Sequence, residues 1–317
     1  MTVLELITGA QRHLEDAGVS FGHGTSNAFD EAAWLVLWQL GLPLDTPLDG
    51  PSGAPDIVAN RAVTPAEQAQ VATLLRARIE TRKPAAYLTR EAWLQGVAFY
   101  VDERTIVPRS LIAELLVSGA LDCWLSESSR HVLDLCTGNA SLAILAAMVY
   151  PDVAIDASDI SDDALAVARI NLDKHSLHSR INLIESDGLA RVRGRYDLIV
   201  CNPPYVNAHA MAALPPEYQA EPALALDGNR CGGDDGMDFI RGLLRDVPAH
   251  MTDAAVLVLE IGNEREHFEA AFPTLEAVWL PTSAGEDQVL LLTRQALEKR
   301  CRPGWPALQS AVCPAKS

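Results

Sequence analysis

The chain has 317 residues, 49% of them hydrophobic, and its 25 Lys and Arg residues against 42 Asp and Glu residues give a net charge of −17. This length favours two structural units, and the composition is that of a globular protein with an ample core. So acidic a chain lacks the electrostatic footprint of a protein that binds a phosphate backbone; it suits a basic protein partner, or the acidity serves only solubility.

Six cysteines and eight histidines are scattered along the chain, with no CxxC pair, no HExxH and no repeat at ligand spacing. This pattern argues against a metal site or a disulfide framework and favours a reducing compartment. The first residues carry charges throughout, unlike a signal peptide, and no run approaches about 18 uninterrupted apolar residues. We therefore expect a cytoplasmic protein that holds no metal and spans no membrane.

Residues 1–90 are predicted to be helical, because apolar residues recur there every three or four positions. One helix start is marked by Thr64, Pro65 and Glu67, a capping residue followed by proline at the first helical position. Residues 91–107 then alternate and carry aromatic side chains, which predicts a β-hairpin.

From residue 131 the chain changes to short apolar runs, each followed by polar or helical sequence. The runs lie at 131–136, 153–159, 181–186, 196–202 and 255–262. Strands that alternate with helices predict an α/β fold with a mainly parallel, doubly wound sheet. Two closely spaced runs, LEAVWLP and DQVLLLT, predict a hairpin at the edge of that sheet.

The segment LDLCTGNASLAI, residues 133–144, predicts a strand that ends at Asp134, a tight turn at Gly138 and a helix start. Such a turn can hold a nucleotide-like ligand near the helix N-terminus. Asp159 closes the next strand 21 residues after Gly138, a separation that suits hydrogen bonds to ribose hydroxyls. Asp187, after the third strand, could reach an adenine amino group. These signals fit NAD as well as S-adenosylmethionine, and also a packed turn with an exposed acid.

The segment DLIVCNPPYVNAHA, residues 197–210, is an apolar run that stops at Asn202-Pro203-Pro204-Tyr205. Proline cannot donate to a sheet ladder, so the strand ends here and Asn202 lies at its carboxyl end, where open α/β sheets bind ligands.

This tetrapeptide suits a planar NH₂ group that must act as a nucleophile. If the Asn202 side-chain oxygen and the Pro203 carbonyl each accept one N–H, the nitrogen is fixed with its lone pair facing a sulfonium methyl group. Tyr205 would supply an aromatic wall. The pattern therefore favours S-adenosylmethionine over NAD; the alternative is a rigid surface turn.

Together LDLCTGNAS, DASDIS, CNPPYV and VLEIGNE resemble the HemK-type class I S-adenosylmethionine-dependent methyltransferases, which modify a glutamine side-chain amide in proteins. FGHGTSNAFDEAAWLVLW, RKPAAYLTREAWLQGVAFYVDERTIVPRS and LPPEYQAEPALALDG resemble the branch that methylates the third ribosomal protein of the large subunit. The resemblance spans residues 1–295 and implies a Rossmann-like seven-stranded sheet with an N-terminal helical domain and a β-hairpin linker.

The resemblance also assigns residues to the two ligands. The turn after the first strand would meet the methionine end of the cofactor. Asp159 would meet the ribose, and Asp187 and Gly188 would meet the adenine. The Asn-Pro-Pro-Tyr turn would hold the target glutamine. The expected cofactor set is Asp134, Cys136, Thr137, Gly138, Asn139, Ala140, Asp159, Ile160, Asp187, Gly188 and Asn202. The expected substrate set is Asn202, Pro203, Pro204 and Tyr205, with Asn202, Pro203 and Tyr205 as the catalytic residues.

Two positions depart from the family pattern. Asn139-Ala140 stands where the family has a small-residue turn that ends in a second glycine, and Ala140 tolerates fewer backbone conformations than glycine. Gly188 stands where relatives often carry a bulky residue, which leaves the adenine less wall. Both departures bear on cofactor affinity rather than on the fold.

Four parts are expected along the chain. They are a helical substrate-recognition domain over 1–90, a hairpin linker over 91–110, a methyltransferase domain over 111–295 and a disordered tail over 296–317.

The expected partner is a basic ribosomal protein. Residues 206–236 predict a long loop rather than a strand, and its acids should attract such a substrate in a salt-sensitive way. These acids are Glu217, Glu221, Asp227, Asp234 and Asp235, against Arg230. Alternative functions are methylation of release factors, adenine-N6 methylation of nucleic acid, and a non-catalytic binding module. We expect no DNA partner, and the sequence carries no signal for an oligomeric state.

Overall fold

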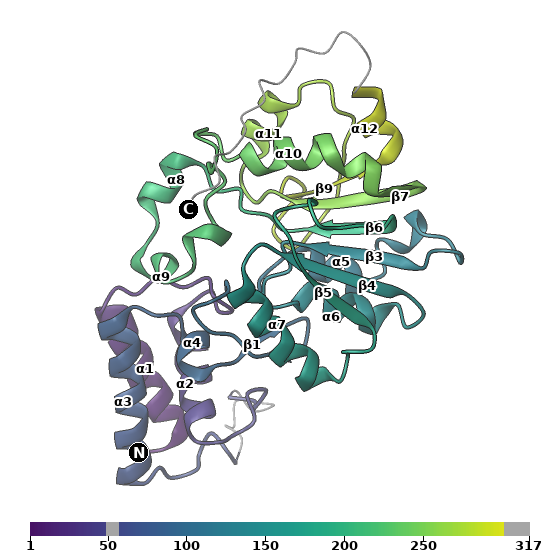
Figure 1. The fold of residues 1–317 in the computed structure, drawn as a ribbon. Coiled ribbons are helices and arrows are strands. Elements are labelled where there is room, and N and C mark those ends of the chain that lie inside the picture. The colour runs from purple at the N-terminus through teal and green to yellow at the C-terminus, as the bar shows by residue number, and fades with distance from the viewer. Residues whose placement is uncertain (49–56, 301–317) are drawn as a thin grey trace.

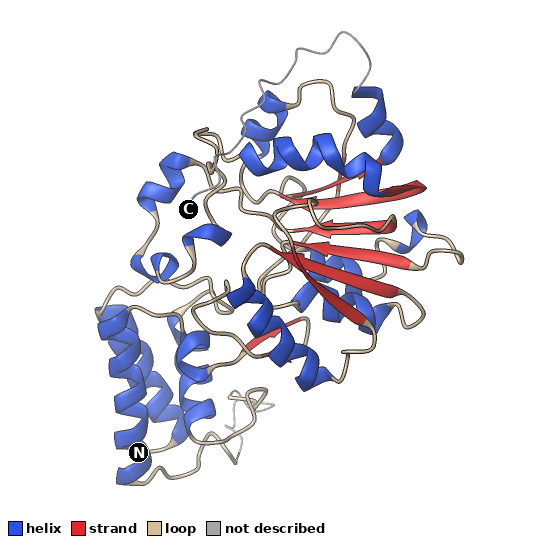
Figure 2. Ribbon diagram, in the orientation of Figure 1, coloured by secondary structure: helices blue, strands red, loops and turns tan. Residues whose placement is uncertain are grey.

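The computed structural model describes residues 1–48 and 57–300. A group of helices at the N-terminus lies beside an α/β part built on a seven-stranded sheet (Figures 1 and 2). The strand order in this sheet is β5-β4-β3-β6-β7-β9-β8, and a separate two-stranded sheet is formed by β1 and β2. The predicted α/β fold with a seven-stranded sheet and N-terminal helices is confirmed.

The elements follow one another along the chain as predicted. The strands are β1 (Ala92–Leu94), β2 (Val97–Phe99), β3 (His131–Leu135), β4 (Ala154–Asp159), β5 (Ile181–Glu185), β6 (Tyr196–Cys201), β7 (Met251–Glu260), β8 (Val278–Trp279) and β9 (Val289–Thr293). The α-helices are α1 (Val3–Asp16), α2 (Ala28–Gln39), α3 (Pro65–Thr81), α4 (Ala85–Thr89), α5 (Ile112–Val117), α6 (Ser141–Val149), α7 (Asp162–His175), α8 (Ala208–Ala213), α9 (Pro216–Gln219), α10 (Asp238–Asp246), α11 (Arg265–Ala271) and α12 (Arg294–Arg300). The 3₁₀ helices are η2 (Asp122–Trp124), η3 (Ala223–Ala225) and η4 (Val247–His250).

The N-terminal helices start where their capping residues predict. Thr64 and Glu67 form a reciprocal capping box: the Thr64 hydroxyl oxygen accepts from the Glu67 N–H at 3.3 Å, and the Glu67 carboxylate accepts from the Thr64 N–H at 2.8 Å. Pro65 occupies the first turn, where its missing N–H costs nothing. The helices then bury apolar side chains against one another, which gives this part a core of its own.

Arg78 of α3 is completely buried in that helical part. Its Nε donates to Glu31 Oε1 at 2.8 Å, its Nη2 donates to the Ser20 carbonyl at 2.9 Å, and its Nη1 lies 3.4 Å from Glu217 Oε1. Burial raises the pKa of Glu31, and the charge of Arg78 opposes that rise. A buried guanidinium needs such partners, because an isolated charge in the interior is very costly.

The large sheet is covered by helices on both faces. β4, β3 and β6 run parallel, so that Leu133 pairs with Asp156 on one side and with Ile199 on the other. Successive side chains of a strand point to opposite faces. Accordingly Val132 packs with residues of α5, α6 and α7, and Leu133 packs with residues of α10, α11 and α12. Both faces are therefore dry, as a parallel sheet requires.

The predicted edge hairpin is confirmed, with one refinement. β9 runs antiparallel to both neighbours, and its Leu291 pairs with Val258 of β7 and Val278 of β8. The second strand of the hairpin thus lies inside the sheet, and the short β8 forms the edge.

The tail predicted from residue 296 was wrong for residues 296–300. These residues belong to the helix α12. Ala296 and Leu297 are buried and give α12 an apolar side, and Leu297 belongs to the core that packs on the sheet. Residues 301–317 lie outside the described part of the chain.

As predicted, the segment 206–236 does not form a strand of the sheet. It contains the short helices α8, α9 and η3. The expectation that its acids face solvent was wrong for Glu217 and Glu221, which are 0% and 4% exposed. Glu217 Oε1 lies 3.1 Å from Arg82 Nη1, and the Glu221 carboxylate meets Arg109 at 2.6 and 2.7 Å. Both acids form internal ion pairs. The segment therefore presents less negative charge to a basic substrate than its composition suggests.

Over residues 1–48 and 57–300, no helix combines the length and apolar character that crossing a membrane requires. The same residues contain no group of three or more His, Cys, Asp or Glu side chains placed to hold a metal ion. Cys123, Cys136 and Cys201 are free thiols.

We predict that Arg78→Ala lowers the free energy of unfolding by about 3–5 kcal/mol, because Glu31 and Glu217 would remain buried without their shared counter-charge. Urea unfolding followed by tryptophan fluorescence, to which Trp34 and Trp38 of α2 contribute, measures the loss. Arg82→Ala is the control: its side chain is 32% exposed, and its loss should be about 1 kcal/mol or less. Equal losses in the two variants would contradict this account of the buried ion pairs.

Candidate active site

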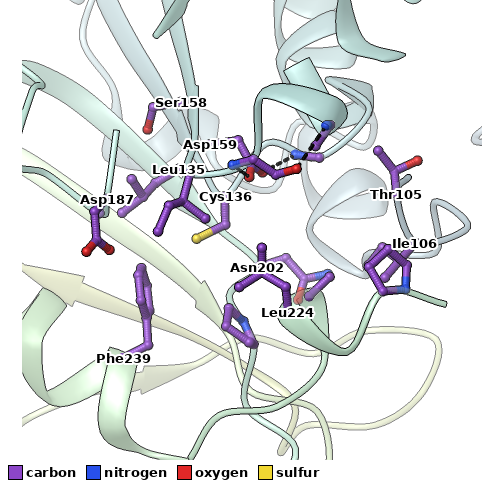
Figure 3. Close-up of a pocket in the computed structure, with 18 of the residues that line it drawn as sticks. Thr105, Ile106, Leu135, Cys136, Ser158, Asp159, Asp187, Asn202, Leu224 and Phe239 are labelled. Atoms are coloured by element: carbon purple, nitrogen blue, oxygen red, sulfur yellow. Dashed lines mark hydrogen bonds between the residues drawn. The ribbon is translucent and has the colours of Figure 1, made fainter. Parts of the chain in front are cut away.

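A pocket opens at the carboxyl edge of the parallel strands, where β3, β4, β5 and β6 end. It encloses about 710 Å³, including its open mouth. Figure 3 shows Asp187 and Phe239 on one side of this pocket and Thr105 and Ile106 on the opposite side. The site is therefore built by the sheet edge together with segments that come from outside it.

Eight of the residues predicted for the site line the pocket. They are Cys136, Gly138, Asp159, Ile160, Asp187, Gly188, Asn202 and Pro204. They come from the ends of four strands that are far apart in the sequence, so the parallel topology has brought them together.

Six other predicted residues are not among those that line the pocket. They are Asp134, Thr137, Asn139, Ala140, Pro203 and Tyr205. Ala140 caps α6 with a left-handed φ of +65° and is fully buried in the core. The missing second glycine therefore places a strained backbone at the helix start, at a cost of about 1–2 kcal/mol, and adds no side chain to the pocket.

Asp159 links the turn after β3 to the end of β4. Its Oδ2 accepts from the Gly138 N–H at 2.9 Å, and its Oδ1 accepts from the Ser161 N–H at 2.9 Å. Burial raises its pKa, against the lowering effect of these backbone bonds and of the Arg230 charge. The carboxylate keeps acceptor capacity on the pocket side, which suits a ligand with hydroxyl donors.

Asp134 lies beneath the same turn and is completely enclosed. Its Oδ2 accepts from Thr137 Oγ1 at 2.5 Å and from the Ala143 N–H at 3.0 Å. Burial raises its pKa to about 7.

Several buried polar atoms around this turn have no hydrogen-bond partner among the described residues. They are Asp134 Oδ1, Asn139 Nδ2, Ser158 Oγ and Thr105 Oγ1. Such orphaned groups are rare in native interiors and point to a ligand or water that would satisfy them. Asp134 Oδ1 can accept from an ammonium group, and Asn139 Nδ2 and the two hydroxyl groups can donate to a carboxylate. The set therefore fits the two charged groups of an amino acid.

Asn202 follows the last residue of β6 and lies on the pocket wall (Figure 3). Within the described residues its side-chain amide has no hydrogen-bond partner. An amide with free acceptor capacity at a strand end can receive the N–H of a planar NH₂ group, as the sequence predicted.

Two glycines, Gly262 and Gly236, lie so close to Tyr205 that a side chain at either position would not fit. A Cβ on Gly262, where φ is +52°, would lie 2.6 Å from Tyr205 Cε2, and a Cβ on Gly236 would overlap the Tyr205 carbonyl oxygen. Burial raises the pKa of Tyr205, and the Glu260 charge adds to the rise, so the phenol stays neutral. A side chain at Gly262 would therefore displace the Tyr205 ring.

Sequence reasoning missed the part of the wall that loops contribute. These residues are Arg104, Thr105 and Ile106 before α5, Pro222, Leu224, Ala225 and Arg230 in the 206–236 segment, and Phe239 of α10. Leu135, Ser158, Ser161, Ala164 and Ser186 complete the lining near the strand ends. The quoted segments that resemble the family contained several of them, but no local pattern marked them as wall residues.

A ring from another element borders Gly188, the position that was expected to give the adenine less wall. A Cβ on Gly188 would lie 3.7 Å from Phe239 Cε2, so an aromatic ring from α10 already stands at this position. The space that a bulky residue would fill at position 188 is bordered here by a side chain from another element.

The chain is similar in sequence to methyltransferases. The family model of the methyltransferase small domain matches residues 113–220. The ribosomal protein uL3 glutamine methyltransferase of Bordetella pertussis is 49% identical over 299 residues, which cover 93% of this chain and 96% of that protein. The protein of the same name from Neisseria meningitidis serogroup A is 46% identical over 298 residues, 93% and 94% of the two chains. A solved methyltransferase from Pyrococcus furiosus is 18% identical with a TM-score of 0.44 and covers 63% of this chain and 90% of that one.

We predict that Asp134→Asn makes the ligand-free protein more stable at high pH. The folded-state pKa of about 7 lies above the usual value of 3.8, so the wild type loses stability as pH rises through this window, and an amide does not. Above pH ~7 the variant should gain on the order of 1–3 kcal/mol in free energy of unfolding over the wild type.

Asp197→Asn is the control for this measurement. The pKa of Asp197 is lowered, because bonds from the Arg130 and His131 N–H groups and from Thr252 outweigh its burial, so its amide variant should lose stability in the same range. Denaturant unfolding from pH 4 to pH ~8 would refute the assignment if the Asp134→Asn and wild-type curves ran parallel.

Proposed function

Because the chain belongs to the family of ribosomal protein uL3 glutamine methyltransferases, we propose that it transfers a methyl group from S-adenosylmethionine to the side-chain amide nitrogen of a glutamine in uL3. The observation that carries this proposal is the Asn202 amide, which follows β6 and has no hydrogen-bond partner within residues 1–48 and 57–300, on the wall of a pocket that also presents Asp159. We further propose that the protein acts in the cytoplasm on a basic ribosomal protein.

The pocket residues fit the proposed cofactor. Asp159 would accept hydrogen bonds from the ribose hydroxyls, and Asp187 would meet the adenine beside Gly188 and Phe239. The orphaned Asp134 Oδ1 and Asn139 Nδ2 are of the right kind for the ammonium and carboxylate of the methionine part. When bound, S-adenosylmethionine would supply an electrophilic methyl group on its sulfonium and be left as S-adenosyl-L-homocysteine, while the methylated amide nitrogen would release one proton to solvent.

The protein's own contribution is to position a poor nucleophile. An amide nitrogen attacks weakly because its lone pair is delocalised into the carbonyl. The Asn202 oxygen and the Pro203 carbonyl would each accept one N–H, which fixes the nitrogen and favours its tetrahedral form. The Tyr205 ring, backed by Gly262, would set the plane of the amide.

The decisive experiment combines the purified protein with uL3 and isotope-labelled S-adenosylmethionine. Mass spectrometry of the uL3 peptides should locate one methyl group on a glutamine side chain. Methylation of release factors instead of uL3 would indicate the companion branch, and methylation of DNA would indicate a nucleic-acid enzyme. Cofactor binding without any methylation would favour a binding module.

We predict that Asn202→Ala abolishes turnover and leaves cofactor affinity within a few-fold of the wild type. The amide acts on the nucleophile, so its loss should raise the barrier by several kcal/mol through misorientation. Single-turnover rates and calorimetric titration separate the two effects. Tyr205→Phe should be mild and Tyr205→Ala severe, because the ring is invoked and the hydroxyl is not; an active Asn202→Ala variant would end this mechanism.

We predict that Asp159→Ala weakens cofactor binding by about 1.5–3 kcal/mol, the range for a lost charge-assisted hydrogen bond. Isothermal titration with S-adenosylmethionine measures the loss, and thermal unfolding shows whether the fold survives. Asp163→Ala, an exposed acid in the first turn of α7, serves as the control. Unchanged binding together with a sharp drop in melting temperature would make Asp159 a structural residue.

A further inference from the structure

Glu221 bridges two segments that are far apart in the sequence. Its Oε1 accepts from the Val107 N–H at 2.9 Å and from Arg109 Nη1 at 2.6 Å, and its Oε2 accepts from Arg109 Nη2 at 2.7 Å. Although burial opposes ionisation, the Arg109 charge prevails and lowers its pKa to about 2. A two-pronged Arg–carboxylate pair of this kind is fixed in geometry as well as strong.

The two bridged segments each contribute residues to the pocket wall. Ile106 comes directly before Val107, and Pro222 comes directly after Glu221; both line the pocket, as do Thr105 and Leu224 (Figure 3). In the described part of the chain, no hydrogen bond joins residues 104–106 directly to residues 222–225. The Glu221 carboxylate is thus the polar link that sets the spacing of these two walls.

The other end of α9 is anchored elsewhere. Glu217 is bonded to Arg78 and Arg82 of α3, and none of these three residues lines the pocket. Between the two acids, the Tyr218 ring lies 4.3 Å from the His23 ring and 5.5 Å from the Arg109 guanidinium. Glu217 thus ties this short helix to the N-terminal helices. Glu221 ties the chain just after the helix to the segment before α5, and its Oε2 also lies 3.5 Å from Nε2 of His23 in the N-terminal part.

We propose that Glu221 is a positioning residue for methyl transfer, which holds the Thr105–Ile106 and Pro222–Leu224 walls at the spacing that admits the target glutamine to Asn202. The inference rests on the proposed function. A displacement of about 1 Å at a reacting group can cost on the order of a hundredfold in rate, so a link that fixes two walls has a large effect on turnover.

The test compares Glu221→Gln with Glu217→Gln, a matched pair in size, burial and arginine pairing. Each variant keeps its shape but loses its charge. With uL3 as substrate, Glu221→Gln should lower kcat/KM by roughly tenfold to a hundredfold, and Glu217→Gln should change it only a few-fold at a similar loss of melting temperature. Calorimetry with S-adenosylmethionine should show only a few-fold change for both, because Asp159 and Asp187 are untouched.

Equal losses of kcat/KM in the two variants would overturn the inference, since a merely structural role would affect both alike, and so would a fully active Glu221→Gln. If Glu221→Gln does not fold, Arg109→Lys decides: it keeps the positive charge but not the two-pronged bond, and full activity would overturn the inference. A wild-type protein that leaves uL3 unmethylated in the same assay would overturn the proposed function itself.

Discussion

The parallel register of β4, β3 and β6 is the constraint on which the site depends. Parallel strands end at one edge of a sheet, and here the residues at those ends or just after them are an acid, a glycine turn and an amide. Gly138 donates its N–H to Asp159, so the turn of one strand and the acid of its neighbour form one bonded unit. Everything added from outside the sheet is arranged around that edge.

The strands and turns of this sheet edge could be predicted from the sequence because the signals for them are local. Apolar runs, a proline pair and a glycine turn are read within a few residues of one another, and the strands they predicted are present. The pocket wall from 104–106 and 222–225 was not predictable in the same way. These residues have no shared local pattern, and they meet only because side chains more than a hundred positions apart pair in the interior.

The same reason explains the error over Glu217 and Glu221. A count of charges along 206–236 gives an acidic segment, but a carboxylate attracts distant partners only if it stays in water. Here both carboxylates are neutralised in ion pairs, Glu217 with arginines at the end of α3 and Glu221 with an arginine from the segment before α5. Asp134 shows the opposite case, since it is buried without any cation and is held instead by hydroxyl and backbone donors. Net charge therefore describes the chain and not its binding surface.

The Arg78–Glu217 contact has a consequence for how the protein is made. Its two residues are separated by 139 positions, so a chain emerging from the ribosome presents α3 long before α9 exists. At common synthesis rates the delay is on the order of ten seconds, ample time for the N-terminal helices to form around Glu31 and Arg78. The closing of α9 against them is then a late, long-range docking event.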